Sequence, residues 1–176
     1  NDYGSADYYY VNKSSLPKVY GGFNTSLSWK GFDLSAIFAY SIGGYIYNRD
    51  VTMILHNGSL EGRDWSTEIL RRWTPDNRYT DVPALSTTSN NWNSASTRFL
   101  QNNSYMRLKN LTLSYNLPKQ WISKLSLSSV QVYVQGDNLF TIHRNQGLDP
   151  EQGITGITYY RYPAMRTISG GINVSF

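Results

Sequence analysis

The sequence contains no cysteine, and only two histidines occur among its 176 residues. The lack of cysteine excludes disulfides and thiolate metal sites, although it says little about the cellular compartment. No stretch approaches 18 consecutive apolar residues, which excludes a helical membrane span. His56 and His143 stand in no HExxH or GxSxG spacing. The sequence therefore indicates no catalytic centre, no metal site and no cofactor, and it predicts a protein that is not an enzyme.

The charge pattern gives no sign of a nucleic-acid partner. The formal net charge is +4, but the 16 Lys and Arg residues are spread along the whole chain without a basic cluster. Mean hydropathy is low at −0.46, whereas aromatic residues make up 15% of the chain. That combination suits either one or two soluble domains or an outer-membrane barrel, whose strands alternate apolar and polar residues.

Five segments show the period-two alternation of strands that have one apolar and one polar face. Between the first two lies only Lys30-Gly31, which predicts a tight hairpin turn. Arg107 and Lys109 fall on the apolar parity of the third strand, so we expect them on the lipid side but beyond the hydrocarbon band. The predicted strands cover residues of about 19–29, 32–42, 106–117, 129–136 and 166–176.

Short and long connections alternate between these strands. The connections of about 47–104 and 139–165 are long, whereas the others are short or moderate. Transmembrane barrels have short periplasmic turns and long extracellular loops, a sorting that a soluble sandwich does not need. We therefore predict an all-β fold, a transmembrane antiparallel β-barrel with both long loops outside the cell. A short helix is expected at residues 59–73 within the first loop.

Aromatic residues stand near the predicted strand ends, as interfacial girdles require. Trp29 and Trp121 lie near the periplasmic ends, and Tyr45, Tyr47, Tyr105 and Tyr162 near the external ends. Five strands cannot close a barrel of this kind, so the remaining strands are expected upstream or on another chain. The sequence begins at Asn1 without a signal peptide, which also favours a segment of a longer protein.

Several motifs carry a resemblance to a known family. The C-terminal strand resembles the insertion signal of outer-membrane barrels at Ser169, Gly171, Val174 and Phe176, although an aromatic residue is commoner where Val174 stands. More specific is the order of the strings GGFNTSLSWKGFDLSAIFAYSIGG, RRWTPDN, DVPAL, NNSYMRLKNLTLSYNLP, VQVYVQGDNLFTI, GLDPE and YPAMRTISGGINVSF. Together these strings resemble the C-terminal end of SusC/RagA-type TonB-linked outer-membrane proteins.

The resemblance implies a barrel of about 22 strands with an N-terminal plug, embedded in outer-membrane lipid. It also implies import of an oligosaccharide or oligopeptide, a SusD-like surface lipoprotein as partner, and coupling to TonB through a plug that these residues do not include. Residues 1–176 would then form the C-terminal segment of the barrel. The alternatives are a passive porin, an autotransporter pore and a soluble carbohydrate-binding β-sandwich.

Aromatic residues in the predicted external loops are the candidates for ligand or lid contacts, because sugar rings stack on such faces. Packing of the loops against one another or against the lid is the simpler role for them. A further hypothesis is a Ca²⁺ site at Asp137, Asp149 and Glu151, although turn carboxylates more often cap backbone N–H groups. The aromatic candidates are Trp65, Trp73, Trp92, Tyr159 and Tyr160.

Overall fold

The chain forms two compact units. The computed structural model describes Gly4 and residues 8–58, 60, 62–86, 88, 91–125, 127–145, 147–151 and 155–176. The sheet unit comprises Pro17–Gly44, Asn103–Glu151 and Tyr162–Phe176, and the loop unit comprises Asn1–Leu16, Tyr45–Asn102 and Gln152–Arg161.

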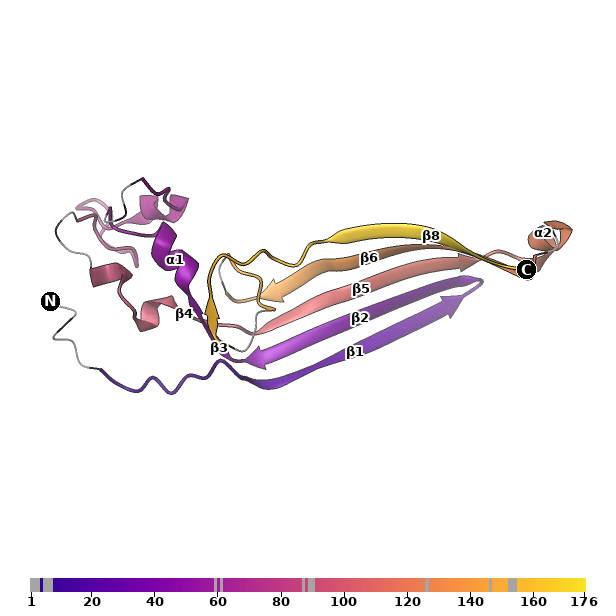
Figure 1. Ribbon diagram of the computed structural model, residues 1–176, viewed down its shortest axis with the longest axis horizontal. Coiled ribbons are helices and arrows are strands. Elements are labelled where there is room, and N and C mark those ends of the chain that lie inside the picture. The colour runs from indigo at the N-terminus through magenta and orange to yellow at the C-terminus, as the bar shows by residue number, and fades with distance from the viewer. Residues whose placement is uncertain are drawn as a thin grey trace. The chain divides into compact units, whose positions relative to one another are not determined.

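The sheet unit is one antiparallel sheet in the order β1-β2-β5-β6-β8 (Figure 1). Its strands lie where the alternation predicts them, apart from the longer β6. The short β1–β2 turn, helix α2 and the C-terminus lie at the same end of the sheet (Figure 1). Within the described residues, β1 and β8 each pair with one strand of the sheet, so both are edges. The strands are β1 Pro17–Trp29, β2 Phe32–Gly43, β5 Tyr105–Asn116, β6 Ser129–His143 and β8 Thr167–Ser175.

One face of the sheet is apolar from edge to edge. Leu27, Leu34, Leu113 and Val134 stand opposite one another on four successive strands. Their exposed fractions run from 39% at Leu34 to 67% at Leu27. No second layer covers these side chains within the described residues, as a soluble sandwich would require.

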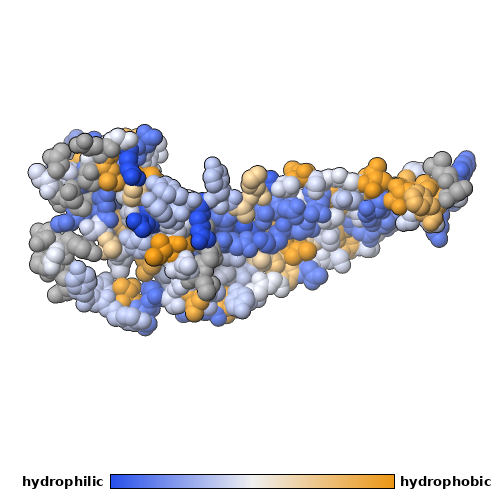
Figure 2. Space-filling model, in the orientation of Figure 1, coloured by the Kyte–Doolittle hydropathy of each residue, from blue (hydrophilic) through white to orange (hydrophobic). Residues whose placement is uncertain are grey.

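The opposite face carries a ladder of polar side chains. Asp33 accepts hydrogen bonds from Ser28 and from Asn116 Nδ2, at 2.5 and 2.6 Å. Gln131 Nε2 donates to Asn116 Oδ1 at 3.1 Å, and Asn173 Nδ2 donates to Gln131 Oε1 at 3.2 Å. This row crosses all five strands, and hydrophilic side chains gather along the sheet in Figure 2. The sheet therefore has one face suited to lipid and one suited to water.

The connections at the α2 end are tight. Lys30 and Gly31 both have positive φ, of 45° and 87°, as the turn of a two-residue hairpin demands. Between β5 and β6 lie α2 at Lys119–Ile122 and the 3₁₀ helix η5 at Ser123–Leu125. In the described part of the chain, no helix has both the length and the apolar character needed to cross a membrane.

Strand β6 is longer than predicted, because it continues to His143 rather than ending at 136. The Asp137-Asn138 pair resembles the start of a loop in sequence, but here it forms a β-bulge. Asn138 has a φ of 52°, and the register with β5 shifts between Leu108 and Asn110. The predicted loop start at 139 was therefore wrong.

The loop unit contains a small sheet in the order β4-β3-β7, in which β7 runs parallel to β3. Leu55, Ile69 and Val82 form its apolar cluster. Its elements are β3 Tyr45–Asn48, α1 Arg49–Ile54, η2 Thr67–Arg71, η3 Asn91–Asn93, η4 Thr97–Phe99, β4 Leu100–Asn102 and β7 Ile157–Thr158.

The helix predicted at residues 59–73 is wrong for most of its length. Only Thr67–Arg71 is helical there, as the short 3₁₀ helix η2, while Ser59 and Glu61 lie outside the described residues. The α-helix lies earlier, at Arg49–Ile54. Its start has a clear cause, because Asn48 Oδ1 accepts a hydrogen bond from the Val51 N–H at 3.1 Å.

Candidate functional site

A second bulge, at Lys109, decides where the cations of β5 point. Ile37 and Phe38 of β2 pair with Asn110 and Leu108, so Lys109 is the extra residue in β5. An extra residue exchanges the two faces of a strand. Arg107 therefore lies on the polar face, where its Nε donates to Thr141 at 2.9 Å. The prediction that Arg107 and Lys109 lie on the lipid side was wrong, because it assumed unbroken alternation.

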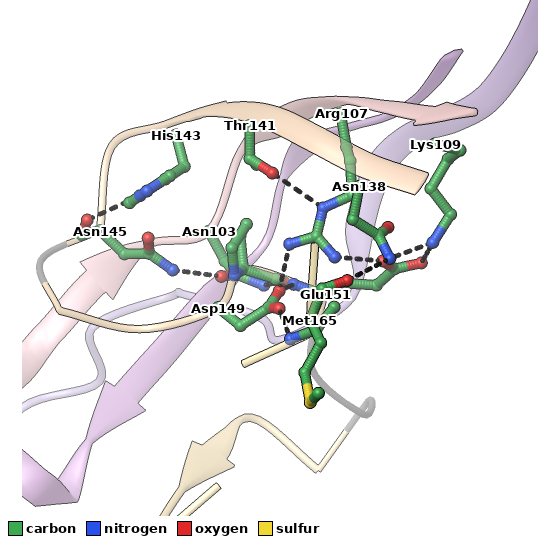
Figure 3. A network of polar contacts seen from close by, with 12 residues as sticks. Asn103, Arg107, Lys109, Asn138, Thr141, His143, Asn145, Asp149, Glu151 and Met165 are labelled. Carbon is green, nitrogen blue, oxygen red and sulfur yellow. Dashed lines mark hydrogen bonds and ion pairs between the residues drawn. The ribbon is translucent and has the colours of Figure 1, made fainter. Parts of the chain in front are cut away.

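Arg107 is the centre of a buried ion network (Figure 3). Its guanidinium contacts Asp149 at 2.5 Å and Glu151 at 2.8 Å. The Arg107 and Asp149 side chains are only 4% and 5% exposed. Lys109 Nζ also contacts Glu151, at 2.7 Å. Two cations thus face two carboxylates, and the charges of these four residues balance.

Asp149 is held as a carboxylate by several donors. Burial by itself raises the pKa of Asp149, but the backbone N–H groups of Ala164 and Glu151 and the Arg107 guanidinium outweigh this effect. The pKa of Asp149 is therefore lowered below its ordinary value. Because Ala164 lies 15 residues further along the chain, one carboxylate joins both ends of the β6–β8 connection.

Asparagine side chains also hold the β6–β8 connection in place by hydrogen bonds. Asn103 Nδ2 donates to the Pro150 carbonyl oxygen at 2.9 Å, and Asn145 Nδ2 donates to Asn103 Oδ1 at 2.9 Å. Asn138, at the β6 bulge, donates to the Met165 carbonyl oxygen at 3.2 Å. Figure 3 shows these side chains converging around Asp149.

The geometry does not favour the calcium hypothesis. Asp149 and Glu151 are neutralised by Arg107 and Lys109, so adding a divalent cation would oppose those positive charges. Asp137 instead accepts hydrogen bonds from Asn110 and Gln135 on the sheet. Among the described residues, no three His, Asp or Glu side chains are grouped so as to hold a metal ion.

In the loop unit, the structure brings two of the predicted aromatic residues together. The Tyr159 and Tyr160 ring centroids are 4.2 Å apart, and the Arg49 guanidinium lies 4.7 Å from the Tyr159 ring centroid. The Tyr160 N–H donates to Asp50 at 3.0 Å. Tyr160 has a φ of 50°, a left-handed conformation that non-glycine residues rarely adopt outside functional sites and turns. Both tyrosine side chains remain exposed.

The predicted tryptophans do not join this pair by any described contact. Trp65 donates from Nε1 to Nδ1 of the buried His56 at 3.0 Å. The Trp73 N–H donates to the Val82 carbonyl oxygen, which fixes the RRWTPDN segment near the apolar cluster. Trp92 lies in η3, and its side chain is outside what the structure describes. These hydrogen bonds of Trp65 and Trp73 are thus local to the loop unit, and both side chains are partly exposed.

The residues of the predicted C-terminal signal alternate between the faces of β8. Ser169 and Gly171 pair with Gln135 and Tyr133, on the polar face. Val174 pairs with Val130 on the apolar face, and Phe176 follows the end of the strand fully exposed.

Sequence reasoning missed the network around Arg107, although a signal was available. The apolar residues Met106 and Leu108 are even-numbered, whereas Leu111 and Leu113 are odd-numbered. This change of parity within one strand is what an inserted bulge residue produces. It would have placed Arg107 on the polar side.

Known proteins resemble this chain in sequence and in fold. No protein-family model matches the chain. TonB-dependent receptor P3 of Formosa agariphila is 34% identical over 166 residues, which cover 88% of this chain and 16% of that receptor. TonB-dependent receptor SusC of Bacteroides thetaiotaomicron is 27% identical and matches 95% of this chain, again over 16% of its own length.

Solved structures agree with these relatives. A RagAB peptide transporter matches with a TM-score of 0.81 and 34% identity over 94% of this chain. The RagAB peptide importer in its open-open state matches with a TM-score of 0.82 and 35% identity. The chain spans 16% of SusC and 18% of the matched RagAB chain. By sequence and by fold, the chain belongs to the SusC/RagA family of TonB-dependent receptors, and its sheet is part of an antiparallel β-barrel wall.

Proposed function

We propose that this chain supplies the last five strands and two external loops of an outer-membrane importer energised through TonB. The importer would take up an oligosaccharide or oligopeptide together with a SusD-like surface lipoprotein, and the rest of the barrel and the plug would come from the remainder of the protein. Such a protein binds and moves its ligand without chemistry of its own.

The observation that carries the proposal is the two-faced sheet, whose edge strands β1 and β8 each pair on one side only within the described residues. The uncovered apolar row through Leu34 and Leu113 suits lipid, while the ladder from Asp33 to Asn173 suits a water-filled interior. Unpaired backbone groups at the edges β1 and β8 would be costly in a membrane unless further strands close the barrel. The relatives named above support the same assignment.

We further propose that Tyr159 and Tyr160 are ligand contacts. Exposed aromatic rings offer stacking faces to sugars and peptide side chains, and Arg49 beside them offers guanidinium donors. The left-handed backbone at Tyr160 supports this role, because strain is retained where function requires it. Trp65, Trp73 and Trp92 remain weaker candidates for ligand or lid contact.

Uptake by the complete receptor tests the function. Labelled oligosaccharides and oligopeptides would be supplied to cells with and without the receptor, before and after an uncoupler collapses the proton-motive force. Uptake that requires both the receptor and the proton-motive force supports an energised importer. Uptake that persists after uncoupling would instead indicate a passive porin and would remove the proposal.

A further inference from the structure

The connection between β6 and β8 is fastened to the polar face of the sheet at both of its ends. Asp149 Oδ1 contacts Arg107 on β5, while Asp149 Oδ2 accepts the Ala164 N–H at 2.6 Å. Near one end the Pro150 carbonyl oxygen accepts a hydrogen bond from Asn103. Near the other end the Met165 carbonyl oxygen accepts one from Asn138 of β6. The anchors lie on both sides of the connection, and Arg107 is the residue that holds both carboxylates, of Asp149 and Glu151, by ion pairs.

We propose that Arg107 is a positioning residue that fixes residues 148–151 against the inner face of the barrel wall, making them a permanent part of the channel lining. This inference rests on the proposed function, because the polar face is the inner face only if the sheet belongs to a membrane barrel. Residues 148–151 then narrow the channel at a fixed place and do not act as a mobile lid.

Burial explains why the attachment is permanent. Arg107 and Asp149 are almost completely removed from water, so separating them leaves a buried charge without its partner. The guanidinium also donates hydrogen bonds to Glu151 and Thr141 through its other N–H groups. It can do so because its planar shape presents several donors at the same time. The Arg71–Asp81 pair of the loop unit is different, because its side chains are 52% and 76% exposed and water can replace either partner.

A cysteine in place of the buried Pro150 reports on the attachment. The complete receptor, with Pro150→Cys as its only cysteine, would be exposed on intact cells to a membrane-impermeant maleimide. The parent should react slowly, because residue 150 is buried. Arg107→Ala should raise the labelling rate about 10-fold or more. Arg71→Ala, which removes an exposed Arg–Asp pair, is the matched control and should leave the rate unchanged.

Barrel assembly is followed in parallel by heat-modifiable migration on gels. If Arg107→Ala does not assemble, Arg107→Lys is used in its place. Lysine keeps the positive charge but cannot donate to Asp149, Glu151 and Thr141 at the same time.

The outcomes separate this inference from the function on which it rests. Faster labelling of an assembled Arg107 variant supports the positioning role. If the assembled Arg107 variant is labelled at the same rate as the parent while energised uptake is intact, the positioning role is overturned and the proposed function is not. Uptake by the parent that ignores the proton-motive force removes the proposed function instead.

Discussion

Tyr133 and Gly171 face each other across the β6–β8 pair, and the tyrosine ring occupies the space above the glycine. A Cβ built on Gly171 would lie 2.6 Å from the Tyr133 hydroxyl oxygen and 2.8 Å from the ring carbon Cζ. The ring thus covers a position that would otherwise leave a gap at the edge of the sheet, a pairing that stabilises glycine-containing strands. Gly171 also belongs to the predicted C-terminal insertion signal, and this contact gives its small size a separate physical reason.

Gly171→Val should destabilise the assembled receptor, because the new side chain must displace the Tyr133 ring. The two residues should be coupled, by about 0.5–3 kcal/mol in a double-mutant cycle. The coupling free energy is measured from the denaturant unfolding midpoints of three assembled variants, which are Gly171→Val, Tyr133→Ala and the double variant. If the two single substitutions change the free energy of unfolding additively, the Tyr133 ring and Gly171 do not stabilise the barrel through each other. Gly170→Val is the matched control, since its Cβ would meet only the Tyr133 carbonyl oxygen, at 3.3 Å.

A new charge should destabilise the barrel much more on one face of β5 than on the other. Leu113→Arg places a cation on the face assigned to lipid, where the cost near the bilayer midplane is about 2–4 kcal/mol. Thr112→Arg places the same side chain on the polar face beside Asn110 and should cost much less. The amount of heat-modifiable receptor in the outer membrane measures the difference. Equal assembly of the two variants would contradict the assignment of the faces.

The strands were predictable because each separates two environments and its residues therefore alternate. The register places Phe23 on Phe38, with ring centroids 4.7 Å apart, and Leu34 opposite Leu113, as unbroken alternation requires. The bulge at Lys109 was not predicted, because unbroken alternation was assumed across the change of parity between Leu108 and Leu111, whereas β6 shows no such change at Asn138. A single such residue moved Arg107 from the expected lipid side to the buried network.

The loops could be predicted only in part, because their structure depends on distant partners. Helix α1 is six residues long, too short to show a helical period, and its cap at Asn48 lies in a strand. The proximity of Tyr159 and Arg49 comes from the parallel pairing of β7 with β3, between Tyr47 and Ile157 and between Asn48 and Thr158. No local pattern specifies such a contact. The aromatic residues could be named as candidates, but not which of them meet.

Removal of the tyrosine rings should weaken ligand capture. Tyr159→Ala takes away a stacking face and the partner of Arg49, which should raise the Kd of the transported ligand about 2- to 10-fold. Tyr79→Ala, at a fully exposed tyrosine of the same unit, is the control and should bind normally. Binding to the purified receptor, with and without the lipoprotein proposed as its partner, gives the comparison. An unchanged Kd for Tyr159→Ala would assign the pair to loop packing.

Acid should release the β6–β8 connection, and the direction follows from the lowered pKa of Asp149. A carboxyl whose folded pKa is depressed stabilises the folded form above its unfolded value of about 3.9, and this stabilisation is lost as pH falls through the folded pKa. The attachment should therefore be constant from neutral pH down to about pH 4 and should weaken only below it. Hydrogen exchange of the Glu151 and Ala164 amides, which donate to Asp149, measures the release. Asp149→Asn should exchange faster at neutral pH and lose this acid dependence, whereas release already near pH 6 would point to a different titrating group.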